Sequence, residues 1–375
     1  MKKQATAELQ RVPLEEVCLG ILGGGLANNC MDFLLKAPQP PSEISVKNAL
    51  KVLEEVGAIY PQEPQQHSEI VIERLTPLGN HLAKLPVHVR LGKMLIFGVL
   101  FKVLDKALTI AACLSSKSPF SANLTNSRQA EAAHRSFAHE SSDFLTLCNV
   151  WESFASARQV EQTNGRKFCD KNFLNYTAMV EIADARKHFF ELLSQIGFVD
   201  ENYFHSPKKI MSSSYNKNLL HERIVSAVIC AGLYPNLAHA TKGRSDQEPT
   251  LWHKGEQVYF HKNSINYKKK GLDTEWVVFH EKFATRRVHV CNTSLIHPFS
   301  ILLFGGSVVV KHLERTVIVD NWIELKVAAQ TGLMFRELRS KIASLLESRF
   351  KNSRSCNSRD NTDILEGVVR LLNWE

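Results

Sequence analysis

The stretch VYFHKNSINYKKKGLDTEWVVFHEKFATRRVHVC, residues 258–291, contains the clearest structural pattern in the chain. Apolar residues alternate with polar ones in three of its segments, Val258 to His261, Trp276 to His280 and Val288 to Cys291. A period of two is the pattern of a half-buried β-strand, and the Asn, Asp and Gly residues between the segments favour turns. The stretch therefore predicts three short strands.

The period of two begins after residue 233 and continues in Val308 to Leu313, Thr316 to Val319 and Trp322 to Val327. Five or six short strands in about 100 residues predict a small barrel or sandwich. After residue 330 the helical period returns, in a stripe from Phe335 to Leu346 and in a second short helix near Ile364 to Leu372.

The preceding part of the chain, residues 91–199, has a helical period nearly throughout, with breaks at Ser118-Pro119 and at Thr163-Asn164-Gly165. Its segment Phe173 to Ile196 places apolar residues at helical spacing and ends at Gly197. We expect a helical bundle in this region.

Residues 1–90 show short helices followed by an extended element. One amphipathic helix is predicted between Pro41 and Gly57, where the glycine supplies the stop. The segment Glu69 to Leu75 alternates and is rich in β-branched residues, which predicts a strand. Thr76-Pro77 then supplies a cap and a first-turn proline for a further helix. Helices followed by a small strand pair predict a winged helix.

The formal net charge of +8 is concentrated in one region. Residues 201–360 contain 24 basic and 14 acidic residues, whereas residues 1–90 contain 9 and 10 and residues 91–200 contain 12 and 11. Such a surplus fits a surface for a polyanion, most simply nucleic acid. A solvated basic surface without a partner accounts for the charge equally well.

Aromatic and cationic side chains are interleaved within this basic region. Aromatic faces stack on bases for about 1 to 3 kcal/mol each, and ammonium and guanidinium groups bind phosphates. Most aromatic residues of a small barrel belong to its core, however, and spacing alone favours that structural interpretation. The residues concerned are Tyr259, Phe260, His261, Lys262, Tyr267, Lys268, Lys269, Lys270, Lys282, Arg286 and Arg287.

A second candidate lies on the apolar helix predicted at 173–196. Arg186 and Lys187 follow Asp184, so a local ion pair or a solvated face is the default interpretation. The alternative is a polar helix side that guides a nucleic-acid strand, with Lys171-Asn172 holding phosphate near the N-terminal end.

Motifs for catalysis or metal binding are absent from the sequence. It has neither a Gly-x-x-x-x-Gly-Lys-Ser/Thr phosphate loop nor a Gly-x-Ser-x-Gly elbow, and the Gly305-Gly306 pair predicts only a tight turn. Its 8 cysteines form no Cys-x-x-Cys pair, so no zinc site is expected, and reduced cysteines fit the cytosol or nucleus. The longest apolar stretch, Met94 to Phe101, is far shorter than the ~20 residues a bilayer needs, so no membrane partner is expected.

A series of strings runs in one order through nearly the whole chain. These are RVPLEEVCL (11–19), FLLKAPQPP (33–41) with residues 46–58, LTPLGNHLAKLP (75–86), GKML (92–95), KSPF (117–120), FCDKNFL (168–174), AGLYPN (231–236), HKNSIN (261–266) and LFGG (303–306). Together they resemble the C-terminal accessory half of the DEAH-box/RNA-helicase-A class of RNA helicases. No single motif carries the resemblance.

The resemblance implies a multidomain α+β fold. Its parts would be a winged helix at 1–88, with the end of a lost second ATPase lobe at its N-terminus, a helical ratchet (helicase-associated) domain at 89–232, an OB-fold barrel at 233–330 and C-terminal helices at 331–375. In such helicases these modules pack on two ATPase lobes and close a tunnel over single-stranded RNA.

The resemblance also implies which positions would contact RNA. The matching residues are Asn172 and Arg186 in the ratchet and His261, Ser264, Lys282 and Thr285 in the barrel. The phosphate loop, the DEAH box and the arginine finger precede this region in the family. ATP and Mg²⁺ therefore belong to the full-length enzymes, and no cofactor or catalytic residue is expected in this chain.

Two strings depart from the family pattern. The family's Ser-Asp-His-Leu is Ser142-Asp143-Phe144-Leu145 here, and its His-Pro-x-Ser-Val-Asn is HKNSIN at 261–266, without the proline. Both departures affect expected RNA contacts and leave the expected fold unchanged.

The sequence thus favours an RNA-binding accessory region of an ATP-dependent 3′ to 5′ DEAH-type RNA helicase, with no chemical step of its own, in the cytoplasm or alternatively the nucleus. The expected partners are single-stranded or structured RNA, a ribonucleoprotein or an activator peptide. The alternative is a protein-interaction scaffold built on the same domains, and ATP hydrolysis by the chain itself is the least favoured. The RNA hypothesis requires Arg186, Lys282 and their neighbours to face outward along one continuous path.

Overall fold

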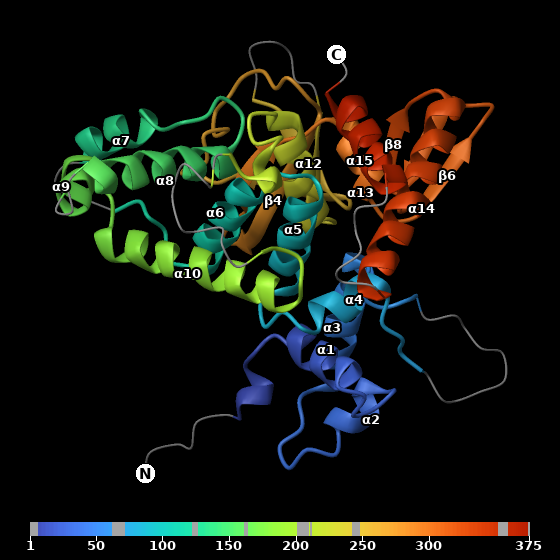
Figure 1. The fold of residues 1–375 in the computed structure, drawn as a ribbon. Helices are drawn as coiled ribbons and strands as arrows, with labels where there is room; N and C mark the ends of the chain where they lie inside the picture. The colour runs from blue at the N-terminus through green and yellow to red at the C-terminus, as the bar shows by residue number, and fades with distance from the viewer. Residues whose placement is uncertain are drawn as a thin grey trace. The chain divides into compact units, whose positions relative to one another are not determined.

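A computed structural model describes residues 7–61, 72–121, 127–160, 164–200, 210, 212–241, 248–351 and 359–373. The chain forms two compact units, one of Met1–Lys93 with Glu337–Ile364 and the other of Met94–Arg336 with Leu365–Glu375. Figure 1 shows the course of the chain and the element labels. No helix in the described ranges is long and apolar enough to cross a bilayer.

The first unit contains short helices around one amphipathic helix. That helix, α3 (Glu43–Val56), begins where the Ser42 hydroxyl accepts a hydrogen bond from the Ser45 amide at 3.1 Å, and it ends at Gly57 in the left-handed conformation. The helix predicted between Pro41 and Gly57 is confirmed. The other helices before it are η1 (Glu8–Gln10), α1 (Glu15–Gly23) and α2 (Cys30–Leu34).

Helix α4 (Pro77–Leu82) begins at the predicted cap, because the Thr76 hydroxyl accepts from the Gly79 amide at 3.0 Å. The predicted strand Glu69 to Leu75 lies partly outside the described residues, and its described end makes only an isolated antiparallel bridge between Leu75 and Ile59.

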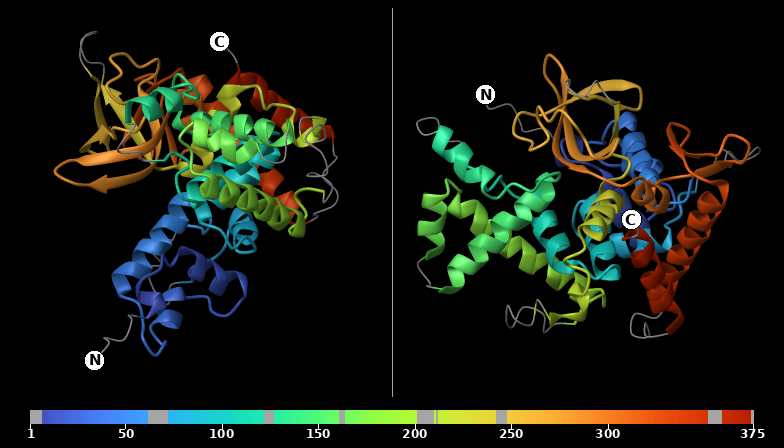
Figure 2. Two further views of the ribbon diagram at one scale, coloured as in Figure 1. Left: turned by 90° about the vertical axis from the view of Figure 1, so that its left-hand side faces the viewer. Right: turned by 90° about the horizontal axis from the view of Figure 1, so that it is seen from above.

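The second unit begins with a group of helices, coloured cyan to yellow-green in Figures 1 and 2. Helix α6 is buried along most of its length and packs against α8 and α10, which explains the continuous apolar pattern of this region. Helix α10 contains the predicted apolar stripe and ends before Gly197, which has a positive φ of 80°. In the described residues the helices are α5 (Val89–Leu100), which enters this unit at Met94, α6 (Leu104–Ser115), α7 (Ser127–Arg135), α8 (Asp143–Val160), α9 (Asn164–Lys171), α10 (Tyr176–Gln195), η3 (Ser214–Asn216) and α12 (Glu222–Leu233).

Five strands close into a barrel in the order β1-β2-β3-β5-β4, coloured yellow to orange in Figure 2. The pair β3 and β5 is parallel and the other pairs are antiparallel. Alternate residues such as Val258, Phe260 and Val290 fill the core. The predicted small barrel is confirmed. Its strands are β1 (Leu237–Thr241), β2 (Thr250–His253), β3 (Glu256–Phe260), β4 (Trp276–Ala284) and β5 (Val288–Leu295).

The last three predicted strands do not belong to this barrel. Helix α13 (Pro298–Phe304) follows β5, and β6 (Val308–Lys311), β7 (Thr316–Val319) and β8 (Ile323–Lys326) form a separate antiparallel sheet. The prediction that all these strands form one barrel is therefore wrong. The barrel is completed by β1 and β2, which were not predicted, and not by β6, β7 and β8. The chain ends in α14 (Ala329–Lys351) and α15 (Arg359–Leu372).

The Gly305-Gly306 pair ends α13 and does not form a hairpin turn. A Cβ added to Gly306 would lie 2.0 Å from the Asp320 Oδ1 atom, so a larger residue there must displace the Asp320 carboxylate. The same carboxylate accepts from the Ser307 amide at 2.6 Å and from the Tyr234 hydroxyl. The pair thus permits a close approach between the end of α13 and the β7–β8 turn.

Candidate nucleic-acid interface on the barrel

Three rings lie side by side across the outer surface of three neighbouring strands. Tyr259 on β3 is paired with His289 on β5, and His289 is paired with Phe283 on β4. The ring centroids of Tyr259 and His289 are 6.3 Å apart, and those of Phe283 and His289 are 5.6 Å apart with their planes within 22°. The core residues Val258 and Val290 point to the opposite face, because side chains alternate along a strand.

His261 extends this group beyond the end of β3. Its amide donates to the Val290 carbonyl at 3.0 Å, and its ring lies 5.4 Å from Phe283 and 6.4 Å from His289. Phe283 is 40% exposed although it is fully apolar, and the other three rings are partly buried. We call Tyr259, His261, Phe283 and His289 the aromatic row.

Cationic side chains lie beside the aromatic row and along the loop that follows His261. The Arg287 guanidinium lies 4.8 Å from the centre of the Tyr259 ring, and Arg286 beside it is exposed in the β4–β5 turn. Three lysines of the loop 261–275 are also exposed, and the ammonium of one of them lies 5.3 Å from the Tyr267 ring. These lysines are Lys262, Lys268 and Lys270.

The charge state of the row depends in part on His261. Burial lowers the pKa of His261 below its usual 6.5, and the neighbouring His289 and Lys262 lower it further. A neutral imidazole at pH 7 offers a flat apolar face, and a protonated one adds a positive charge for phosphate. The arrangement can therefore stack planar groups and hold anions at its rim.

Arg186 does not reach any surface. Its side chain is 3% exposed, and its Nη2 atom lies 2.7 Å from the Asp105 carboxylate of α6. Its Nη1 atom donates to the Asp105 carbonyl at 3.0 Å and to the Thr109 hydroxyl, and the guanidinium covers the Trp151 ring at 4.5 Å. The structure thus places the Arg186 guanidinium inside the bundle and not on the outward path that the RNA hypothesis requires.

Ser264 is also buried, with 8% of its surface exposed, and its hydroxyl lies 2.8 Å from the Thr293 hydroxyl. Ser264 therefore does not lie on the exposed surface that its predicted RNA contact requires. Asn172 is partly buried and donates from its amide to the Phe168 carbonyl at 2.9 Å. Thr285 is exposed in the β4–β5 turn, where its hydroxyl donates to the Arg287 carbonyl at 3.2 Å.

Lys282 is exposed, but it lies on the other face of β4 from the aromatic row. Its register partner is the core residue Val290, whereas the next residue, Phe283, pairs with His289. The Lys282 ammonium is 3.0 Å from the Glu256 carboxylate. The outward path through Arg186 and Lys282 that the RNA hypothesis requires is therefore absent, and the hypothesis fails in that form. Of the six residues that the resemblance matched to RNA contacts, His261 alone belongs to the aromatic row, which Tyr259 joins from the aromatic and cationic set.

Phe283 and His289 were not among the residues predicted from the sequence. One signal for Phe283 was present, because it is the lone large apolar residue in the polar run EKFATRR at 281–287. A large apolar residue on an otherwise polar hairpin end is a candidate for binding. His289 has no such signal, because only the strand register brings it between Tyr259 and Phe283.

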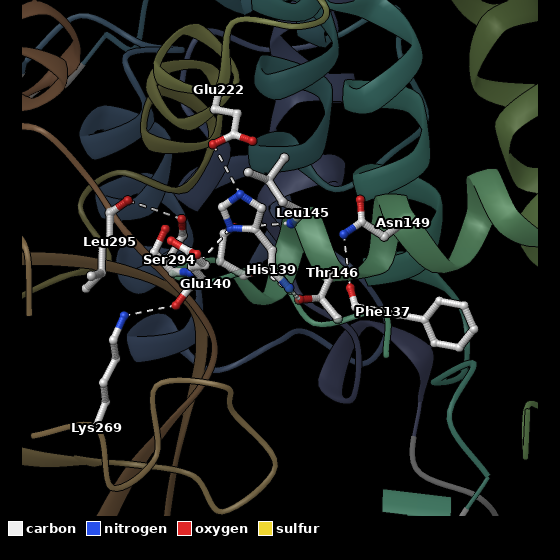
Figure 3. A network of polar contacts seen from close by, with 12 residues as sticks. Phe137, His139, Glu140, Leu145, Thr146, Asn149, Glu222, Lys269, Ser294 and Leu295 are labelled. Atoms are coloured by element: carbon white, nitrogen blue, oxygen red, sulfur yellow. Dashed lines mark hydrogen bonds and ion pairs between the residues drawn. The ribbon is translucent and has the colours of Figure 1, made fainter. Parts of the chain in front are cut away.

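The segment before α8 holds the loop 261–275 and the barrel next to the helices of this unit (Figure 3). The His139 ring lies 3.1 Å from the Glu222 carboxylate of α12, and the His139 amide donates to the Thr146 hydroxyl at 2.9 Å. The Lys269 ammonium donates to the Glu140 carbonyl at 3.0 Å. Barrel and helices thus share one polar network.

Three family models match parts of the chain. Residues 88–147 match the helicase associated domain (HA2), ratchet-like, residues 225–308 match an oligonucleotide/oligosaccharide-binding (OB)-fold, and residues 315–374 match the C-terminal domain in RNA helicases. The chain is homologous to the DExH-box RNA helicases. The resemblance drawn from the strings is confirmed.

The matched relatives are much longer than this chain. ATP-dependent RNA helicase DHX29 of Mus musculus is 34% identical over 98% of the chain, which covers 26% of that protein. DExH4 of Arabidopsis thaliana, a chloroplastic DExH-box ATP-dependent RNA helicase, is 33% identical over 99% of the chain and 28% of its own length. The ATP-dependent DNA/RNA helicase DHX36 of Bos taurus is 31% identical over 97% of the chain and 35% of its length.

Proposed function

We propose that this chain is the RNA-binding accessory region of an ATP-dependent DEAH-type RNA helicase, and that it performs no chemical step by itself. The observation that carries the proposal is the aromatic row, where Phe283 is 40% exposed beside His261, His289 and Tyr259. The HA2 and OB-fold matches and the names of the relatives support it.

The row fits single-stranded RNA for a physical reason. Bases that are not paired within a duplex expose their planar faces, and each base that stacks on an aromatic side chain gains about 1 to 3 kcal/mol. Arg287 lies over Tyr259 at the rim, where a guanidinium can hold a phosphate or stack on a base. Stacking tolerates every base, so the expected ligand is single-stranded RNA without a strict sequence preference.

The remaining expectations belong to the same proposal. The division expected from the sequence assigns residues 1–88 to a winged helix, 89–232 to the ratchet domain, 233–330 to the OB-fold and 331–375 to the C-terminal helices. Within 233–330 the barrel itself comprises β1 to β5, and the sheet β6-β7-β8 lies outside it. ATP and Mg²⁺ are bound elsewhere in a complete helicase, which moves 3′ to 5′ on RNA in the cytoplasm. The chain covers about a quarter to a third of the length of its relatives, which supports the assignment of ATP binding to the rest of a complete helicase.

Binding of labelled single-stranded RNA to the chain across a salt series tests the proposal. We expect the affinity to fall steeply with salt, because bound phosphates release counterions. The variant Phe283→Ala should weaken binding about tenfold, as expected for one lost stack. The control is Phe33→Ala on α2, since Phe33 has the same 40% exposure and lies outside the barrel.

A protein-interaction scaffold would give a different result. RNA affinity would be weak and insensitive to salt, and Phe283→Ala and Phe33→Ala would behave alike. RNA-stimulated phosphate release from ATP by the purified chain would contradict the absence of a chemical step.

A further inference from the structure

Asp143 joins three segments of the second unit through one carboxylate. It is the first residue of α8 and is only 8% exposed. Its Oδ1 atom accepts from the Ile265 amide at 2.9 Å, and its Oδ2 atom accepts from the Thr293 amide at 2.7 Å and the Thr293 hydroxyl at 3.2 Å. Ile265 lies in the loop 261–275 and Thr293 on β5.

Neighbouring groups complete this junction. The Thr293 hydroxyl lies 2.8 Å from the Ser264 hydroxyl and accepts from the Asn266 side-chain amide at 2.9 Å. The Leu295 amide donates to the Ser141 carbonyl at 3.0 Å. Ser264, Asn266 and Thr293 are all buried. We call Asp143, Ser264, Asn266 and Thr293 the Asp143 junction.

The Asp143 junction lies close in sequence to two members of the aromatic row. Ser264 follows His261 by three residues, and Thr293 follows His289 by four. The junction therefore holds the chain just beyond both histidines, and it holds the loop that carries Lys262 and Lys268. Movement of the loop would displace His261, whose amide is bonded to the Val290 carbonyl of β5.

We propose that Asp143 is a positioning residue for RNA binding, which fixes the loop 261–275 and β5 so that the aromatic row and the loop lysines face one ligand. The inference rests on the proposed function and adds a residue that touches no RNA. Its burial excludes a direct contact, and its negative charge would disfavour a nearby phosphate. Any benefit of Asp143 to RNA affinity must therefore act through the groups it holds.

The variant Asp143→Asn, compared with a control that makes the same charge change elsewhere, tests whether Asp143 acts by holding its hydrogen-bond partners in place. The asparagine has the same size as Asp143, but one of the two acceptor oxygens is replaced by an NH₂ group. That NH₂ group faces the backbone N–H of Ile265 or of Thr293, so one hydrogen bond is lost. We expect RNA affinity to fall by up to about tenfold, the size of the one stack at Phe283 that a displaced row would lose. The control Asp170→Asn makes the same charge change at an exposed site on α9 and should leave affinity unchanged or slightly higher.

A double-mutant cycle shows whether Asp143 acts through the row. If it does, the loss in Asp143→Asn shrinks in a Phe283→Ala background, because the misplaced row no longer supplies that stack. A second variant, Ser264→Ala, removes another member of the junction and keeps the backbone bonds to Asp143. If Asp143→Asn does not fold, Ser264→Ala replaces it, and we expect Ser264→Ala alone to weaken binding a few-fold. If Asp143→Asn folds, we expect the losses of the two variants to be non-additive. A direct contact at Ser264 would give additive losses.

Hydrogen exchange without RNA provides a second readout. The Ile265 and Thr293 amides should exchange faster in Asp143→Asn and not in Asp170→Asn, because their acceptor is altered. Wild-type binding that is unchanged in Asp143→Asn and in Ser264→Ala overturns the positioning role alone. Failure of the wild-type chain to bind RNA overturns the proposed function, and the positioning role with it.

Discussion

Arg186 and Asp105 form a buried ion pair between α10 and α6. The Nη2 and Oδ1 atoms are 2.7 Å apart, and the two side chains are 3% and 12% exposed. Because the guanidinium also donates to the Asp105 carbonyl and covers the Trp151 ring, every face of it is occupied by protein. The pair holds the helices of the bundle together and is not part of a binding surface.

Removing one partner of this pair should destabilise the chain strongly. Arg186→Met leaves the Asp105 carboxylate buried without its cation, which lowers the free energy of unfolding by about 3 to 5 kcal/mol. Urea unfolding measures the loss. Lys187→Met on the same helix is the control, because Lys187 is exposed and its pair with Glu191 at 3.7 Å contributes about 0.5 kcal/mol or less.

Adding Asp105→Leu to Arg186→Met should restore part of the stability, since no unpaired charge then remains in the bundle. An Arg186→Met chain that unfolds like the wild type and yet binds RNA more weakly would return Arg186 to the surface role expected from the sequence.

Arg287 and Lys282 should differ in their effect on RNA binding. Arg287 lies beside the aromatic row, whereas Lys282 lies on the other face of β4 and is paired with Glu256 at 3.0 Å. Arg287→Ala should reduce the slope of log affinity against log salt by about 1, the value for one phosphate contact. Lys282→Ala should leave the slope unchanged. Equal slopes for the two variants would show that the row is not the RNA-binding face.

The sequence predicted local structure better than the partners of each element. The spacing of Val46, Leu50 and Leu53 predicted α3, because a buried helical face requires that spacing. Strands β1 and β2 were missed, since β1 has the sequence LAHAT, in which Ala and His do not favour a strand. Membership of the barrel was also missed, because alternation identifies a strand but not its neighbour.

The candidate site was predictable only in part for the same reason. Arg186 resembles a surface residue in its local sequence, and its partner Asp105 is 81 residues away. The composition identified Tyr259, His261 and Arg287 as candidates, but Phe283 and His289 join them only through strand register. Residues whose role depends on a distant partner cannot be ranked from local pattern alone.

Two glycines in the first unit should respond in opposite ways to alanine. A Cβ on Gly79 would lie 1.9 Å from the Ala58 carbonyl oxygen, so Gly79→Ala must displace backbone and should lower stability by about 1 to 3 kcal/mol. Gly20 on α1 has nothing within 4 Å of an added Cβ, and Gly20→Ala should raise stability by up to about 1 kcal/mol. Thermal unfolding of the two variants checks the difference, and a stable Gly79→Ala chain would contradict the close packing of α4.

RNA affinity should rise on acidification through His261. In the free chain, burial and the neighbours His289 and Lys262 lower the pKa of His261 below its usual 6.5, and the Asp143 carboxylate acts in the opposite direction. Bound phosphate favours the charged imidazolium, so the pKa is higher in the complex than in the free chain. The added affinity is therefore present below the free-chain pKa and is lost as the pH rises through the pKa of the complex. The ratio of wild-type to His261→Gln affinity isolates this residue from the other histidines, and it should increase as the pH falls from neutral toward 5. A ratio that does not change with pH would place His261 away from the phosphates.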